Sequence, residues 1–196
     1  MMEKFFFEGD KFIGKSTLLK KCLRYSDYSI SGFYVDRLLN EKAEITGFVL
    51  RDAKALFKTE FGQEDCKEHC FLKIENGQRI RNLAVFEHFG TQLLQEAQSN
   101  KSEIVLLDEI GGMELLIPNF TGELMELMTQ RRKILGVFKS DKNYQRQRRN
   151  SLEKLNINDQ RQKLREQIYL HNGDILELTE KNRNQCEKKL QDFLMQ

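Results

Sequence analysis

The sequence has few residues of the kinds that cross-link a chain or divide it into separate units. It contains one proline, Pro118, no tryptophan, and four cysteines, which are Cys22, Cys66, Cys70 and Cys186. A single proline leaves no proline-rich linker, and four scattered cysteines without a dense framework indicate reduced thiols instead of disulfides. A chain of 196 residues is of ordinary size for one domain and short for two. We therefore expect a single domain spanning residues 1–196.

Long apolar runs are also missing. No stretch approaches the roughly 18 consecutive apolar residues that a transmembrane helix requires. The apolar stretch near the amino terminus, FFF at residues 5–7, is far too short for a signal peptide. These absences predict a cytoplasmic protein that does not enter a membrane.

Neither sign of charge is in large excess. The 32 Lys and Arg nearly balance the 30 Asp and Glu, which leaves a net charge of +2. The basic stretch 131–149 contains one acid, Asp141, and one aromatic residue after its apolar core, Tyr144. This composition favours a solvated face over a nucleic-acid contact, although an electropositive rim over nucleotide phosphates is an alternative. The charge pattern therefore does not favour a nucleic-acid partner, and it identifies no protein partner.

Short apolar runs alternate along the chain with segments of helical period, which is typical of an α/β fold. The apolar pair 30–35 and 45–50, joined by a polar stretch, predicts a small antiparallel hairpin. The other expected strands are 5–7, 55–58, 71–75, 104–107, 134–138, 168–171 and 174–179. Four helices are expected: one after residue 15, one over 86–97, one over about 119–132, and one after Thr179. Thr179 is a candidate cap for the last helix.

The first strand leads into a motif that is typical of a phosphate-binding loop. Residues Gly9, Asp10, Lys11, Phe12, Ile13, Gly14, Lys15 and Ser16 match the pattern G-x-x-x-x-G-K-[ST] at every fixed position. The glycines let backbone N–H groups approach phosphate oxygens, and the lysine can reach the β and γ phosphates. The Ser16 hydroxyl can ligate Mg²⁺ at the start of the following helix, where Thr17 has a lesser role. We expect residues 9–17 to bind the nucleotide.

A second motif supplies the acids that such a loop needs. The apolar run 104–107 ends at Asp108, and Glu109 follows directly. A carboxylate at the carboxyl end of a buried strand faces the crevice where open α/β sheets bind ligands, so Asp108 can help hold Mg²⁺. Glu109 can accept a proton from a water molecule aligned on the γ phosphate. The expected catalytic residues are therefore Lys15 and Glu109, with Ser16 and Asp108 at the metal.

Five stretches resemble the small P-loop nucleoside-triphosphatases, the family that includes the cancer-related nucleoside-triphosphatase. They are GDKFIGKSTLL at 9–19, GFYVDRL at 32–38, TGFVLRD at 46–52, LLDEIGGMEL at 106–115 and LELTEKNRNQCEKKL at 176–190. The resemblance implies a RecA-like, mostly parallel sheet flanked by helices. It also implies Mg²⁺-dependent hydrolysis of nucleoside triphosphates to diphosphate and phosphate, with broad tolerance of the base.

The chain departs from this family pattern at two positions. Phe12 stands where many members have a small residue, and Gly112 stands where many have lysine. If that lysine neutralises charge in the transition state, another cation must serve, and Arg131, Arg132, Arg146, Arg148 and Arg149 are candidates. Asn182 and Arg183 match the family's carboxyl-terminal motif. They either contact the base or ribose or form a surface pair at the start of a helix.

Three alternatives remain open from the sequence. A nucleotide or small-molecule kinase shares the phosphate loop, although Glu109 beside Asp108 favours hydrolysis. A slow, nucleotide-controlled binding protein would use the γ phosphate to position a loop. The cluster CKEHC at residues 66–70 could bind zinc, but it lacks the second ligand pair that structural zinc sites usually have.

Overall fold

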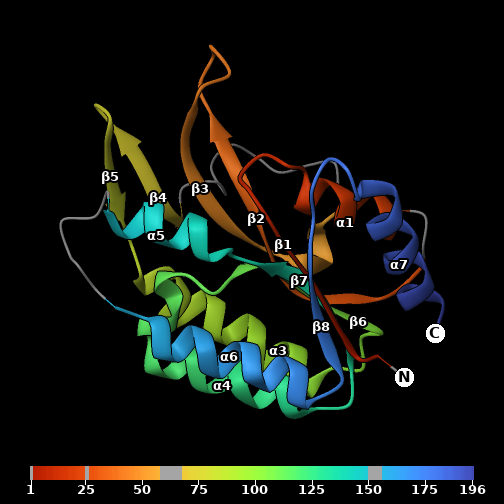
Figure 1. Cartoon of the computed structure of the whole chain (residues 1–196). Helices are drawn as coiled ribbons and strands as arrows, with labels where there is room; N and C mark the ends of the chain where they lie inside the picture. Colours follow the sequence, from red (N-terminus) through yellow and green to blue (C-terminus); the bar gives the residue numbers. More distant parts are fainter. Residues whose placement is uncertain (1, 25–26, 58–67, 150–155) are drawn as a thin grey trace.

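The structure, a computed structural model, describes residues 2–24, 27–57, 68–149 and 156–196, and the side chains of 146–149 are outside this description. Its centre is an eight-stranded sheet in the order β5-β4-β3-β2-β6-β7-β1-β8 (Figure 1). The strands are β1 Lys4–Glu8, β2 Ile30–Leu39, β3 Ile45–Asp52, β4 Cys70–Glu75, β5 Gln78–Arg81, β6 Ile104–Ile110, β7 Lys133–Phe138 and β8 Gly173–Glu177.

The sheet is parallel in one half and antiparallel in the other. Neighbouring strands are parallel from β2 through β6, β7 and β1 to β8. The strands β2, β3, β4 and β5 pair antiparallel. In Figure 1 the β2–β3 and β4–β5 hairpins project from the same end of the sheet. The expected hairpin is thus confirmed, and a second one extends it.

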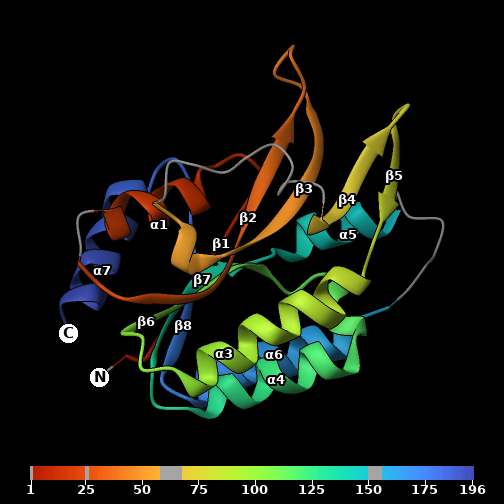
Figure 2. The ribbon, with the colours of Figure 1, turned by 180° about the vertical axis from the view of Figure 1, so that it is seen from behind.

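Helices cover both faces of the parallel half (Figures 1 and 2). On one face lie α1 Lys15–Arg24 and α7 Arg183–Met195, and on the other lie α3 Thr91–Ser99, α4 Pro118–Thr129 and α6 Asn158–Leu170. The helix α5 Asp141–Arg149 follows β7, and short helical turns occupy Ala53–Ala55, Phe86–Gly90 and Met113–Leu116. Among the described residues, none of the helices combines the length and apolar character needed to cross a bilayer.

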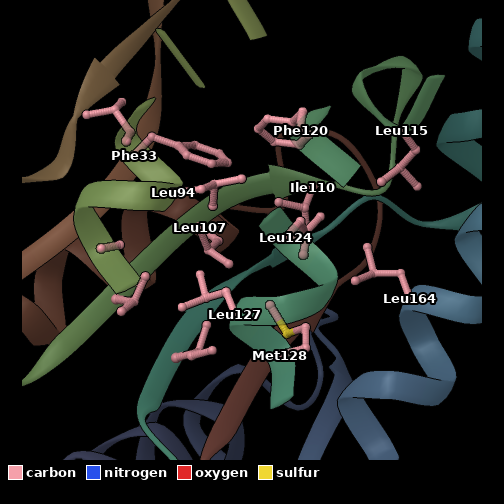
Figure 3. Close-up of a cluster of buried hydrophobic side chains, with 14 of the residues drawn as sticks. Phe33, Leu94, Leu107, Ile110, Leu115, Phe120, Leu124, Leu127, Met128 and Leu164 are labelled. Atoms are coloured by element: carbon pink, nitrogen blue, oxygen red, sulfur yellow. The ribbon is translucent and has the colours of Figure 1, made fainter. Parts of the chain in front are cut away.

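Burial on both faces explains why the parallel strands are almost continuously apolar. Phe5, Phe6 and Phe7 are all fully buried, so successive side chains of β1 enter opposite cores. Figure 3 shows the larger core, where Leu107 of β6 packs against Leu124 and other residues of α4. The α/β fold class with a mostly parallel, helix-flanked sheet is therefore confirmed.

Two expected strands are wrong. Residues 53–55 form a 3₁₀ turn because the Asp52 carboxylate accepts a hydrogen bond from Lys54 N at 2.9 Å and so caps a helical turn; residue 58 lies outside the described residues. Residues 168–170 form the end of α6, and 171 lies in the following turn. In α6 the buried Leu164 and Ile168 are four residues apart, a helical spacing that a short apolar run conceals.

Two helix boundaries also differ from expectation. The helix expected to reach about residue 132 ends at Thr129, and β7 starts at Lys133. Asn182, and not Thr179, stands immediately before α7, although the Thr179 hydroxyl accepts a hydrogen bond from Asn182 N at 3.3 Å.

Candidate functional site

The candidate site lies at the carboxyl ends of the parallel strands. The phosphate loop follows β1, Asp108 and Glu109 lie near the carboxyl end of β6, and β7 lies between these two strands. Because parallel strands end at the same edge of the sheet, residues about 100 positions apart in the sequence meet there. The loop and the two acids are thus brought together by strand order.

The phosphate loop is curled around the lysine that was expected to bind phosphate. Lys15 Nζ donates hydrogen bonds to the carbonyl oxygens of Gly9 at 3.0 Å and Asp10 at 2.7 Å. Burial lowers the pKa of Lys15, while the charges of Glu109 and Asp108 oppose this effect. Gly14 has a φ of 88°, a conformation that glycine adopts at little cost, and α1 begins directly after it.

Phe12 and Ile13, at the crest of the loop, face different surroundings. Phe12 is 70% exposed and has a φ of 65°, which is uncommon for any residue other than glycine. Glycine would adopt this angle at little cost, whereas a residue with a Cβ is strained there. Ile13 is partly buried and packs against the smaller core. The guanidinium of Arg37, on β2, lies 5.0 Å from the centre of the Phe12 ring.

The expected metal ligands are in direct contact. The Ser16 hydroxyl donates to Asp108 Oδ1 at 2.8 Å, and Val35 N donates to Oδ2 at 3.4 Å. Asp108 is only 2% exposed. Burial, reinforced by the charge of Glu109, raises the pKa of Asp108 to about 6.

This pair fits Mg²⁺, which prefers oxygen ligands and keeps several waters. A hydroxyl and a carboxylate lie side by side, and the carboxylate is buried in a way that costs free energy until a cation compensates its charge. Within the described residues, no group of three or more His, Cys, Asp or Glu side chains could enclose a metal ion. The fit therefore depends on one protein carboxylate, one hydroxyl, and oxygens from phosphate and water.

Glu109 is held in an unusual backbone conformation. Its φ is 66°, and a residue with a Cβ persists there only when its surroundings impose it. The chain then turns through Gly111 and Gly112, and Glu114 Oε1 accepts a hydrogen bond from Gly112 N at 2.6 Å. Glu114 is 4% exposed, so this acid fastens the turn that follows Glu109.

Two cavities meet at Lys15 and Glu109. The larger, of about 390 Å³, is lined by the phosphate loop, the start of α1, the end of β2 and the two acids. The smaller, of about 70 Å³, continues toward the residues after β7 and also borders Lys11 and Phe48. Phe12 lies at the rim of the larger cavity and leaves it open.

The structure separates the candidate cations. Arg131 and Arg132 precede β7, at the amino ends of the parallel strands, and Arg132 donates to Ser102 O at 2.8 Å. They cannot reach the phosphate loop of the same chain, so the sequence-based suggestion for these two residues is wrong in cis. The side chains of Arg146, Arg148 and Arg149 lie outside the described residues.

Of the carboxyl-terminal pair, only Arg183 reaches the phosphate loop. Its Nη1 donates to Ile13 O at 2.8 Å. The Asn182 side chain instead donates to Glu177 O at 2.7 Å and accepts from Thr179 N at 2.8 Å. Asn182 therefore fixes the loop between β8 and α7, and Arg183 links that loop to the phosphate loop.

Only part of the CKEHC cluster belongs to the described residues. Cys66 lies outside the described residues, the His69 ring stacks on Phe89 with centroids 3.6 Å apart, and Cys70 Sγ donates to Leu72 O at 3.4 Å. The structure thus gives His69 and Cys70 packing roles.

Several residues that border the cavities were not expected from the sequence, and four of them are polar or charged residues at or beyond strand ends. Asp36 and Arg37 come from the end of β2, and Lys139 and Asn143 follow β7. A signal existed for the last two, since they follow an apolar run that was expected to be a strand. Its use required the knowledge that β7 lies between β1 and β6.

Comparisons with known proteins agree with this geometry. A family model described as NTPase matches residues 4–191. The crystal structure of THEP1 from the hyperthermophile Aquifex aeolicus superimposes with a TM-score of 0.64 and 19% sequence identity, covering 98% of this chain and 99% of that one. No curated protein matches the sequence significantly. The family match spans nearly the whole chain, and the chain therefore belongs to the NTPase family.

Proposed function

We propose that this chain, acting as one domain over residues 1–196, hydrolyses nucleoside triphosphates to diphosphate and phosphate in the presence of Mg²⁺. The observation that carries this proposal is the 2.8 Å hydrogen bond between Ser16 and Asp108. It joins the helix start after the phosphate loop to the acid of β6, with Glu109 adjacent. Membership of the NTPase family supports the same reaction class.

Residues 9–17 would bind the nucleotide. The backbone N–H groups from Asp10 to Ser16, including those at the amino end of α1, would donate hydrogen bonds to the phosphate oxygens. Lys15 now donates to two loop carbonyls, and these contacts would be exchanged for oxygens of the β and γ phosphates. Ser16 and Asp108 would hold Mg²⁺, which when bound neutralises phosphate charge and orients the triphosphate.

Glu109 is the proposed general base. It borders both cavities, so it can face a water molecule placed beyond the γ phosphate. The water oxygen forms a bond to the γ phosphorus while the bond from phosphorus to the β–γ bridging oxygen breaks. The bond's electron pair stays on the diphosphate, and the water proton passes to Glu109. Inorganic phosphate and nucleoside diphosphate are the products.

A test of this assignment measures phosphate release from ATP, GTP, CTP and UTP, with and without Mg²⁺. We expect Glu109→Gln to lower kcat by about 100-fold or more while ATP binding persists, because the amide cannot take a proton. Glu126→Gln changes an exposed acid on α4 and serves as the matched control. Phosphate release that Glu109→Gln leaves unchanged would reject the role of Glu109.

One observation favours a second candidate, which is phosphoryl transfer to a small acceptor. The larger cavity extends past Asp108 to Arg37 and Leu39 on β2, beyond the phosphate loop, where a phosphoryl acceptor could lie. Adding candidate acceptors such as nucleosides and nucleoside monophosphates to the same assay separates the two reactions. Transfer would appear as a phosphorylated acceptor formed faster than free phosphate.

A further inference from the structure

Lys139 occupies the place that a side chain at Gly112 would take. A methyl group built on Gly112 would overlap Nζ of Lys139 and lie 2.7 Å from Oε2 of Glu114. Gly112 has a φ of −114°, so its backbone would accept other residues, and it is this lysine that fills the space. The turn after the two acids thus receives its positive charge from a different strand.

Strand order brings Lys139 to the site. It directly follows β7, which pairs with β1 on one side and with β6 on the other. The first residue beyond the carboxyl end of β7 therefore lies between the phosphate loop and the two acids. Lys139 borders the same small cavity as Lys15 and Glu109.

The backbone of Lys139 is fixed on both sides. Its N–H donates to Ile110 O at 2.8 Å, and its carbonyl accepts from Arg161 Nη2 at 2.7 Å. Arg161 also donates to Gly111 O, so one buried guanidinium ties the residue after β7 to the turn after β6. Within the described ranges, Lys139 forms no ion pair with a carboxylate. The Glu114 carboxylate lies beside the same Gly112 position, and Lys139 also borders the smaller cavity, where its ammonium can meet a ligand.

The cavity also contains a buried acceptor that the fold leaves unused. Asn143, 6% exposed, donates from its amide nitrogen to Gly9 O at 3.0 Å, and its Oδ1 has no hydrogen-bond partner in the described residues. A buried acceptor without a partner is costly, and a water molecule that donates to it removes this cost. The cavity, about 70 Å³, is large enough for such a water.

We infer that Lys139 is a catalytic cation of this NTPase. Its ammonium stabilises the negative charge that develops on the γ-phosphoryl oxygens, while Glu109 and Asn143 hold the attacking water. This inference depends on the proposed hydrolysis. It assigns to Lys139, at the end of β7, the positive charge beside the turn at Gly111 and Gly112, since residues 108–115 contain no lysine or arginine.

The test compares Lys139→Met with the wild type in steady-state hydrolysis of Mg-ATP. We expect kcat to fall by about 100-fold or more, with KM changed by less than about threefold, because the charge acts mainly in the transition state. Binding of ADP with aluminium fluoride, which mimics the transferring phosphoryl group, should be lost while binding of ADP alone persists. Lys101→Met, an exposed lysine at the amino end of β6, is the matched control.

Relocating the charge provides an independent check that does not depend on a loss of function. Lys139→Gly removes the nearest side chain to Gly112, so the double variant Gly112→Lys with Lys139→Gly returns an ammonium to the same region with a small shift of the Glu114 carboxylate. We expect the double variant to hydrolyse ATP at least about tenfold faster than Lys139→Gly alone.

The outcomes separate this inference from the proposed function. If the wild type hydrolyses ATP and the kcat of Lys139→Met is within threefold of the wild-type value, the role of Lys139 is overturned and the proposed hydrolysis is not. An equal loss of affinity of Lys139→Met for ADP with and without aluminium fluoride would also overturn the role of Lys139, because a lysine with only a structural role would affect both. No phosphate release from the wild type or from Lys101→Met would contradict the proposed hydrolysis, and the inference about Lys139 would fall with it.

Discussion

At the scale of single residues, the candidate site contains charged side chains whose burial opposes their charge while their hydrogen bonds favour it. Asp108 is a buried carboxylate that accepts hydrogen bonds from Ser16 and Val35. Lys15 is a buried ammonium bonded to carbonyl oxygens. Burial raises the pKa of Asp108 and lowers the pKa of Lys15, and both shifts favour the neutral form of the side chain. Such desolvation is typical of sites where a ligand brings the compensating charge.

The raised pKa of Asp108 leads to a stability prediction for the metal-free protein. Folding raises the pKa of Asp108 from its ordinary 3.8 to about 6, so folding favours the protonated acid. The free energy of unfolding therefore falls as pH rises through about 6. Asp108→Asn removes the titrating carboxyl group. We expect the free energy of unfolding of this variant, relative to that of the wild type, to increase by about 1 kcal/mol between pH 5 and pH 8.

Urea unfolding of both proteins at several pH values measures this difference. Adding Mg²⁺ should stabilise the wild type more at pH 8 than at pH 5 and should have little effect on Asp108→Asn. A difference between the two proteins that does not change with pH would contradict the assignment.

At the scale of elements, α6 connects the two turns that follow β6 and β7, beside the candidate site. Arg161 donates to the carbonyl oxygens of Gly111 and Lys139 and to the Asp141 carboxylate, and its guanidinium lies 5.1 Å from the Phe138 ring. It is 4% exposed. A helix on one face of the sheet thus determines how the ends of β6 and β7 are spaced.

We expect Arg161→Met to lower the free energy of unfolding by about 2–4 kcal/mol, because two buried carbonyl groups lose a charged donor. Arg161→Lys should recover only part of this loss, since an ammonium cannot bridge both carbonyls as the planar guanidinium does. Urea denaturation measures the change, and Lys163→Met, an exposed residue of the same helix, is the control. A loss below about 0.5 kcal/mol would show that Arg161 does not brace the two turns.

At the scale of the whole molecule, a hydrophobic core covers each face of the sheet, and the candidate site lies at the carboxyl ends of the central strands. The larger core includes Leu124 of α4, which is fully buried against β6 (Figure 3). The cavities border the strand ends, so this core supports them without lining them. Stability and catalysis should therefore separate in variants of this core.

Truncation of a core residue tests this separation. We expect Leu124→Ala to lower the free energy of unfolding by about 2–5 kcal/mol through the lost burial and the remaining cavity. Its KM and kcat at a temperature where it stays folded should remain within about twofold of the wild type. Leu170→Ala, at a leucine that is 72% exposed, should change stability by less than about 0.5 kcal/mol. A core variant that stays folded but loses activity would contradict the separation.

Local patterns predicted most of the fold correctly. The apolar runs 5–7, 104–107 and 134–138 are strands because both faces of the parallel half are covered, which makes the signal strong. The errors at 55–58 and 168–171 arose where a short apolar run suits a strand and a buried helical turn equally. There a single side chain, such as the capping Asp52, decided the outcome.

The sequence by itself determined the phosphate loop, the two acids of β6 and the α/β class, because each depends on spacing within a short stretch. Tertiary structure alone decided that β7 lies between β1 and β6, which places Lys139 and Asn143 beside Lys15 and removes Arg131 and Arg132 to the opposite end of the strands. Strand order depends on contacts between residues far apart in the chain. No local pattern encodes it.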